Sequence, residues 1–444
     1  MHHGPDLRMP MPPFAADPDT HVTTLANGVR VLTLALPGRA TVNVTVFVRT
    51  GSQHESRRQN GISHVVEHMA FKGTEARDCQ HINLDAEQLG AEVNAHTDKD
   101  HTAFHIEGLV RDSAEFIRML ADIVLRSTFP DDELERERQV ILHEVTEDEE
   151  DSLSTAYKLF DQACYGDHPI AQPVIGQRRN IRRFTRDELL GYVQRQYTAG
   201  NVIVGVAGDV DPAQILRWVD AAFGALPRGS DNTVTPPVYS GGFKLRRLTG
   251  CAQTHLVLGF PMPSVHGDHP PYVMAAALFG EGMSSPLLDQ LRERRGLAYH
   301  ASCSADLMES CGQFVIEAST APEQLLELVS EVSRLLAAQA DAIDETRLQR
   351  AFNQLTVRSL RDRERPARRL EAAALDLFMH GAVRTTAMGL ARLQAVTAAD
   401  ARRAFQSLLI ATPAVALTGR IGKGAEERVQ ASLARLGTRL QAAA

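Results

Sequence analysis

The sequence predicts an α+β protein built as two similar halves. Strand-like and helix-like segments alternate in both halves, a linker rich in Pro, Gly and Ser (226–242) divides the chain almost in half, and the second half repeats the element order of the first. At 444 residues the chain is also too long for one ordinary core. We therefore assign 1–20 to a disordered leader, 21–225 to a first domain and 243–444 to a second.

Composition narrows the class of protein. A hydrophobic content of 43% with 23% charged residues is that of a soluble globular protein, and no stretch approaches the eighteen apolar residues of a transmembrane helix. A net charge of −8 argues against nucleic acid or an anionic membrane as a partner. The N-terminal residues lack the apolar core of a secretory signal, so we expect a cytoplasmic location. Five scattered cysteines without C-x-x-C spacing indicate buried reduced thiols rather than disulfides or a Cys-ligated metal.

The first half contains the clearest local patterns. Strands are expected over 21–50, where valines alternate with polar residues downstream of an Asn27-Gly28 hairpin turn. A polar segment then leads to a helix around His64, with Ser63 as its N-cap. The other elements expected here are an extended pair over 92–109 with a turn at 98–100, helices over 112–127, 131–149 and 184–197, a strand over 202–207 and a helix from 211.

The second half repeats this order after the linker. It starts with a strand, continues through a helix, a glycine-containing turn and a second helix, and ends in paired strands followed by two long helices. The expected strands cover 253–259, 298–305 and 312–318, and the expected shorter helices cover 272–279 and 287–294.

The motif with the clearest chemistry is His64-Val65-Val66-Glu67-His68. At about 100° per residue on a helix, His64, Glu67 and His68 share one face. Two imidazoles one turn apart can chelate Zn²⁺ and leave room for a third protein ligand, and a carboxylate between them can accept a proton from water. This H-x-x-E-H order is the inverzincin motif. The second half contains no such motif, so it does not hold a metal in that way.

A third ligand is available on the acidic helix expected over 131–149. Glu144 has the apolar neighbours Ile141 and Val145, which favour a packed helix that draws Glu144 inward. Glu137 lies two turns before Glu144 on the same face. The alternative for either glutamate is a solvated helix face.

Several longer segments resemble one family, the M16 peptidases, which include pitrilysin, insulin-degrading enzyme and the mitochondrial processing peptidase. The size and two-half layout are similar to the short-chain members. The resemblance extends from about Val22 to Gly419 and implies two homologous α/β-sandwich halves, each a mixed, largely antiparallel sheet packed by helices, that form half of a clamshell. The segments that carry it are LANGVRV, NGISHVVEHMAFKGT, NAHTDKDHTAF, YTAGNVIVGVAGDVD and GEGMSSPLLDQLRERRGLAY, together with the spacing of Glu137 and Glu144.

The resemblance implies a role for each residue of the motif. His64, His68 and Glu144 would bind one Zn²⁺ per chain, and Glu67 would activate a water molecule. Glu137 would orient one of the ligands. With this ligand set complete, four further histidines are expected to be incidental: His96, His101, His105 and His143.

The resemblance also implies residues that contact the substrate. Asn94 and Ala95 would lie on an edge strand that binds the substrate backbone by β-augmentation. Arg292 and Tyr299 would approach the scissile carbonyl and stabilise the oxyanion. Without the resemblance, Arg292 could equally be surface charge and Tyr299 a core tyrosine.

These expectations describe a zinc-dependent endopeptidase that hydrolyses extended peptides in an enclosed chamber. In short chains of the family the zinc half and the Arg/Tyr half that meet belong to different subunits, so we expect a homodimer, with a heterodimer as the alternative. The acidic run 147–151 hints at basic residues near the cleavage site. Two other functions stay open: a non-catalytic structural or assembly subunit, and a maturation protease dedicated to one precursor peptide.

Overall fold

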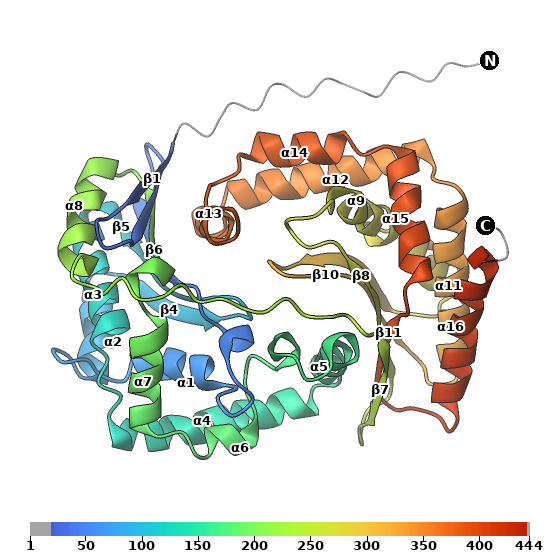
Figure 1. Ribbon diagram of the computed structural model, residues 1–444, viewed down its shortest axis with the longest axis horizontal. Helices are drawn as coiled ribbons and strands as arrows, with labels where there is room; N and C mark the ends of the chain where they lie inside the picture. The colour runs from blue at the N-terminus through green and yellow to red at the C-terminus, as the bar shows by residue number, and fades with distance from the viewer. Residues whose placement is uncertain (1–18, 442–444) are drawn as a thin grey trace.

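The computed structural model describes residues 19–441 of the chain, with side chains to residue 434. Most of the predicted leader therefore lies outside the described residues, although Thr20 already begins strand β1. The two sheets lie at opposite ends of the molecule, with helices between and around them (Figure 1). Within the described part of the chain, no helix combines the length and apolarity that crossing a bilayer requires.

The first sheet has six strands in the order β1-β2-β6-β3-β5-β4. Neighbours pair antiparallel except β2 and β6, which are parallel. Helices cover both faces, which is why β6 is buried along its whole length. The strands are β1 (Thr20–Thr24), β2 (Arg30–Ala35), β3 (Thr41–Val48), β4 (Glu92–Thr97), β5 (Thr102–Leu109) and β6 (Val202–Gly208).

The second sheet repeats this topology with five strands in the order β7-β11-β8-β10-β9. Here too one pair, β7 and β11, is parallel and the others are antiparallel. Strands β7 to β11 thus match β2 to β6 in both order and direction, which confirms two similar halves. The strands are β7 (Gly242–Arg247), β8 (Thr254–Met262), β9 (His300–Leu307), β10 (Gly312–Thr320) and β11 (Ala414–Gly419).

The helices follow the predicted order, with additions in both halves. The first half contains α1 (Ile62–Ala70), α2 (Cys79–Gln88), α3 (Ser113–Leu125), α4 (Asp131–Glu150), α5 (Ser152–Tyr165), α6 (Arg178–Ile181), α7 (Arg186–Gln196) and α8 (Pro212–Phe223). The second half contains α9 (Pro270–Gly280), α10 (Pro286–Leu288), α11 (Leu325–Asp341), α12 (Glu345–Arg363), α13 (Pro366–His380), α14 (Thr386–Gln394), α15 (Ala398–Ile410) and α16 (Ala425–Gln441).

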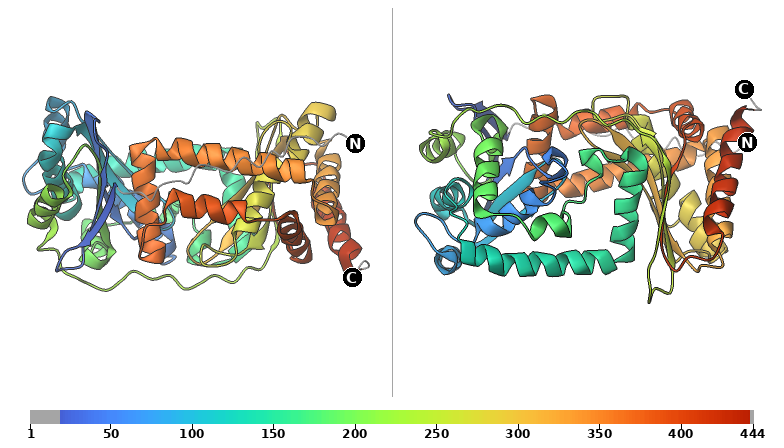
Figure 2. Two further views of the ribbon diagram at one scale, coloured as in Figure 1. Left: turned by 90° about the horizontal axis from the view of Figure 1, so that it is seen from above. Right: turned by 60° about the horizontal axis from the view of Figure 1, so that its bottom comes forward.

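Each half gives one helix to the sheet of the other. Helix α13 of the second half packs on β2, β3 and β6, where Leu370 is fully buried. Gly205 makes room for it, because a Cβ at this position would lie 2.9 Å from Leu370 Cδ1. Helix α5 of the first half packs on β7, β8 and β11 through Phe160 and its neighbours. In Figure 2, right, α4 runs along the lower side and α5 turns up beside the second sheet. Each half therefore has a large apolar core of its own, and two smaller apolar clusters contain residues of both halves.

The segment 226–241 crosses between the halves as an extended strand-free stretch (Figure 1). It is fixed near its start by the Asn232 amide, which donates to the carbonyls of Arg49 and Gln196. Near its end, the Ser240 N–H donates to the carbonyl of Cys164. The predicted linker thus lies between the sheets, and its last residue, Gly242, begins β7.

Two local predictions for the second half need correction. The helix expected over 287–294 is a short α10 followed by a π-helical turn, Asp289–Arg294. The strand expected over 298–305 starts at His300, so Tyr299 lies just outside it. The five cysteines are all free, as expected from their spacing, but only Cys164 is classed as buried, and the other four are partly buried.

Candidate metal centre

Helix α1 presents the H-x-x-E-H motif on one face and packs with the other. Val65 and Met69 are buried in the first core, so His64, Glu67 and His68 are left facing away from it. This is the result of helical periodicity acting on a nine-residue helix whose apolar positions all fall on one side.

The start of α1 differs from the prediction, because Gly61 and not Ser63 is the N-cap. Gly61 has φ of +99°, and a Cβ there would lie 2.7 Å from the Cα of Gly176, so only glycine suits the position. The buried carboxylate of Glu55 accepts hydrogen bonds from the N–H groups of Gly61 (2.7 Å) and Ser63 (2.8 Å). The Ser63 hydroxyl instead contacts Tyr192 Oη at 2.8 Å. The Glu55 side chain, six residues before Gly61, therefore caps the helix.

Glu144 on α4 completes a cluster of three possible metal ligands. Its Oε2 lies 3.8 Å from His64 Nε2 and 3.5 Å from His68 Nε2. One ligand atom from each side chain lies within 4.8 Å of the other two. Ligands about 2.0–2.1 Å from a tetrahedral ion are separated by about 3.3 Å, so the three groups fit Zn²⁺ with small adjustments.

Glu137 contacts the same cluster at the His68 nitrogen that faces away from Glu144. Its Oε2 lies 3.1 Å from His68 Nδ1, and its Oε1 is 2.6 Å from the ammonium of Lys72. A carboxylate on Nδ1 fixes the ring orientation and leaves Nε2 facing Glu144. The sequence analysis does not include Lys72, which follows the motif by four residues and lies just beyond the C-cap of α1, Phe71, so helical spacing gives no signal for it.

The pKa values of His64 and Glu67 suit metal binding and proton transfer. Burial lowers the pKa of His68, but the hydrogen bond with Glu137 and the charge of Glu144 outweigh burial and raise it, so a metal at His68 would displace a proton. Burial and the neighbouring His68 lower the pKa of His64 to about 4, which keeps the ring neutral and able to act as a ligand. Burial raises the pKa of Glu67 above that of an ordinary glutamate. A carboxylate of raised basicity is a better proton acceptor near neutral pH.

Asn94 and Ala95 lie on β4, the edge strand of the first sheet. In the described residues β4 pairs only with β5, and no strand covers its other edge, although the Ala95 N–H donates to Oδ1 of Asn94 at 2.8 Å. Helix α1 packs beside β4, which puts this edge next to the motif. The position therefore suits the expected substrate-binding role.

Arg292 and Tyr299 lie against each other in the second half. The guanidinium carbon of Arg292 is 5.3 Å from the centroid of the Tyr299 ring. Tyr299 is 79% exposed, so it is not a core tyrosine. Arg292 belongs to the π-helical turn, a distortion often found at functional sites. The recorded contacts of Arg292 are with Met283, Glu293 and Tyr299, all within its own half.

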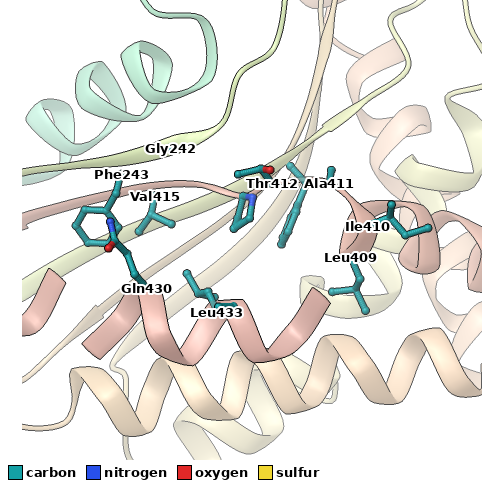
Figure 3. Close-up of a pocket in the computed structure, with 12 residues that line it drawn as sticks. Gly242, Phe243, Leu409, Ile410, Ala411, Thr412, Val415, Gln430 and Leu433 are labelled. Atoms are coloured by element: carbon teal, nitrogen blue, oxygen red, sulfur yellow. The ribbon is translucent and has the colours of Figure 1, made fainter. Parts of the chain in front are cut away.

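An apolar pocket of about 370 Å³ lies elsewhere, between β7, β11, α15 and α16 of the second half (Figure 3). Its lining includes Phe243, Leu409, Val415 and Leu433 and contains no acidic, basic or histidine side chain among the described residues. It therefore lacks groups for hydrolytic chemistry.

Comparison with known proteins finds relatives over most of the chain. Residues 30–178 match the model described as insulinase (peptidase family M16), and residues 183–355 match the peptidase M16 inactive domain. An uncharacterized zinc protease of Rickettsia felis is 31% identical over 360 residues, which cover 79% of this chain and 85% of the relative. One from Mycobacterium bovis is 32% identical over 412 residues, with 90% and 93% covered. The mitochondrial-processing peptidase subunit beta of Blastocladiella emersonii is 31% identical over 265 residues, with 59% and 57% covered.

A solved structure also shares the fold. A protease from Helicobacter pylori superposes with a TM-score of 0.83 at 20% identity, covering 91% of this chain and all of the other. At this identity the likeness concerns the fold alone. The sequence relatives decide the family: at 31% identity over 85% of the length of one named zinc protease, this chain belongs to the M16 peptidases.

Proposed function

We propose that the protein is a zinc-dependent endopeptidase. The observation that carries the proposal is the convergence of His64, His68 and Glu144 within ligand distance of one another, with Glu67 on the same face of α1. The names of the relatives, zinc proteases, support the same conclusion.

His64, His68 and Glu144 would hold the ion, and Glu137 would keep His68 in the binding orientation. Bound zinc supplies a Lewis acid that polarises the scissile carbonyl and lowers the pKa of water. Glu67 then accepts the proton of the attacking water and passes it to the leaving amine. Arg292 and Tyr299 donate hydrogen bonds to the oxyanion.

The substrate would bind as an extended strand. The edge of β4 at Asn94 and Ala95 would pair with a peptide backbone, which would displace the Asn94 side chain from the Ala95 N–H. An enclosed chamber would admit peptides and unfolded segments rather than folded proteins. A preference for basic residues has little support, because Asp148 is paired with Lys158 and Glu149 with Arg178.

The catalytic unit would be a homodimer with two composite sites. Arg292 and Tyr299 contact only each other and near neighbours of their own half in the described residues, and Tyr299 is exposed, as expected of groups that await a second chain. A heterodimer with an M16-like partner is the alternative.

A Glu67→Gln chain provides the test. It should retain zinc, measured by mass spectrometry, and lose hydrolysis of an unstructured peptide by two or more orders of magnitude, because the amide cannot accept the proton. A wild-type chain that binds no zinc on reconstitution would instead indicate a non-catalytic structural subunit. Cleavage of a single precursor among many peptides would favour the dedicated maturation protease.

A further inference from the structure

A second group of possible metal ligands lies where the two halves of the chain meet. It consists of His96 at the end of β4, His101 just before β5, and Glu371 on α13 of the second half. Oε1 of Glu371 lies 3.3 Å from His96 Nε2 and 3.6 Å from His101 Nε2. These separations resemble the 3.8 and 3.5 Å of the first cluster.

The two imidazole nitrogens have no other partner. Nε2 of His96 and Nε2 of His101 are both buried, and neither has a hydrogen-bond partner of acceptable geometry. The side chain of His101 is only 2% exposed. Buried polar atoms without a partner are costly, so two that converge on the same carboxylate oxygen require an explanation.

The groups behind these ligands also match a metal site. Nδ1 of His101 lies 2.7 Å from Oδ1 of Asp100, the same carboxylate–histidine arrangement that Glu137 makes with His68. On the other side, Oε2 of Glu371 faces the guanidinium of Arg368 at 3.4 Å, which leaves Oε1 for the histidines. Two of the three ligands, His101 and Glu371, are thus each held by an outer charged group.

We propose that His96, His101 and Glu371 form a second divalent-metal site, suited to Zn²⁺, that fastens the β4–β5 hairpin of the first half to α13 of the second. Two imidazoles and one carboxylate are a ligand set that Zn²⁺ accepts, with water in the fourth position. The exposed part of His96, 42% of its side chain, provides the access route.

The site would link the substrate-binding edge to the packing of the two halves. His96 directly follows Asn94 and Ala95 on β4, so a metal held there would restrain the edge strand only while α13 is docked on the first sheet. The sequence analysis treats His96 and His101 as incidental. It could not associate them with Glu371, because Glu371 follows them by some 270 residues.

Without a metal, the same side chains can form a charged cluster. The carboxylates of Asp100, 2.7 Å from Nδ1, and Glu371, 3.6 Å from Nε2, favour a protonated His101 in that state. A metal ion would replace that proton. The two states differ in metal content, which makes them separable by experiment.

The test measures zinc in the full chain after reconstitution and desalting. The His64→Ala/His68→Ala variant, whose first cluster is disabled, should retain one equivalent. Adding His96→Ala and Glu371→Gln should remove it. With Co²⁺ in place of zinc, the His64→Ala/His68→Ala variant should show the visible absorption of a low-coordinate site. The variant with all four substitutions should not show it.

A matched control is His105→Ala in the same His64→Ala/His68→Ala background. His105 lies near His96, with ring centroids 6.2 Å apart, but outside the proposed ligand set, so this variant should keep its zinc. Circular dichroism would establish that all variants are folded. Zinc should also raise the melting temperature of the His64→Ala/His68→Ala protein. It should not raise that of the variant that also contains His96→Ala and Glu371→Gln. If the His64→Ala/His68→Ala protein retains no zinc, or if zinc survives the loss of His96 and Glu371, the second site does not exist.

Discussion

The Nδ1 of His68 lies 3.1 Å from the Oε2 of Glu137, which fixes the ring so that its other nitrogen faces Glu144. Glu137 is itself held by Lys72. Glu137 would therefore act on a bound metal through His68. Removing the Glu137 carboxylate should weaken metal binding without removing a ligand.

Glu137→Gln is expected to weaken zinc binding by about 10–100-fold while the fold is retained. The amide keeps the shape of the side chain but loses the charge that orients the imidazole and raises its basicity. Competition with a chromophoric chelator measures the affinity. Glu147→Gln on the exposed part of the same helix is the control, since within residues 19–441 the Glu147 side chain forms an ion pair with His143 alone. Equal affinities for the wild type and Glu137→Gln would exclude the positioning role.

The composite site predicts complementation between two inactive chains. Glu67→Gln removes the proton acceptor from one half, and Tyr299→Phe removes a hydrogen-bond donor from the other. Random mixing makes half of the dimers mixed, each with one intact site of two, so about a quarter of the wild-type rate should return. Peptide hydrolysis after co-refolding or subunit exchange provides the measurement.

Pairing Glu67→Gln with Glu144→Gln is the control for that experiment. Both changes damage the zinc half, so no combination of these chains contains an intact site. A rate recovered only in the first mixture supports sites shared between subunits. No recovery in either mixture, with dimers present by sedimentation, would mean that Arg292 and Tyr299 do not act across the interface.

Local patterns in the sequence were enough to predict much of the first half. The alternating valines of β3 and the acidic and apolar periodicity of α4 set the strand and the helix within a few residues. The short strands β7 and β11 were missed. β7 is an edge strand with charged residues, and β11 is a brief apolar run; both are defined by their pairing, which depends on residues far away in the chain.

In the candidate site, too, residues close in the sequence could be predicted and residues joined only by the fold could not. The ligands His64 and His68 could be found because they share one helix, and family resemblance supplied Glu144. Glu55, which caps α1, and Glu371, which faces His101, were missed because the sequence does not distinguish a buried or half-buried carboxylate from an exposed one. Only folding brings these charges to their partners.

Acid should loosen the segment that carries Arg292 and Tyr299. Arg295, just after the π-helical turn, pairs with Glu331 at 2.7 Å, and Arg334 also contacts that carboxylate. The Arg334 hydrogen bond in particular lowers the pKa of Glu331. A lowered carboxyl pKa stabilises the fold above about pH 4.3, the ordinary glutamate value, and this contribution disappears as the pH falls below it.

Glu331→Gln should therefore be less stable than the wild type near neutral pH, and the difference in unfolding free energy should shrink below about pH 4. Urea titrations at a series of pH values measure this difference. Glu323→Gln, which has no recorded ion pair among the described residues, is the control. A difference that stays constant down to pH about 3 would mean that the carboxylate charge of Glu331 adds nothing to stability.

Leu370 tests whether the second half stabilises the first sheet. It is fully buried between α13 and β6, so Leu370→Ala should lower the unfolding free energy by about 2–5 kcal/mol. Met388→Ala on α14, where the side chain is 55% exposed, should change it by less than about 0.5 kcal/mol. Urea unfolding of both variants gives the comparison, and similar values for the two would contradict the packing of α13 on this sheet.

The exchange of helices further predicts that residues 21–225 do not form a compact unit alone. Without α13, the face of the first sheet that contains Leu32, Phe47 and Ile203 would be exposed to water. α5 would likewise lose β8 and β11, so that Phe160 is uncovered. Such surfaces bind hydrophobic dyes and promote association. Dye binding and sedimentation of the isolated 21–225 fragment should therefore reveal an apolar, self-associating protein. A monomeric fragment with a sharp unfolding transition and no dye binding would show that the sheet does not depend on α13.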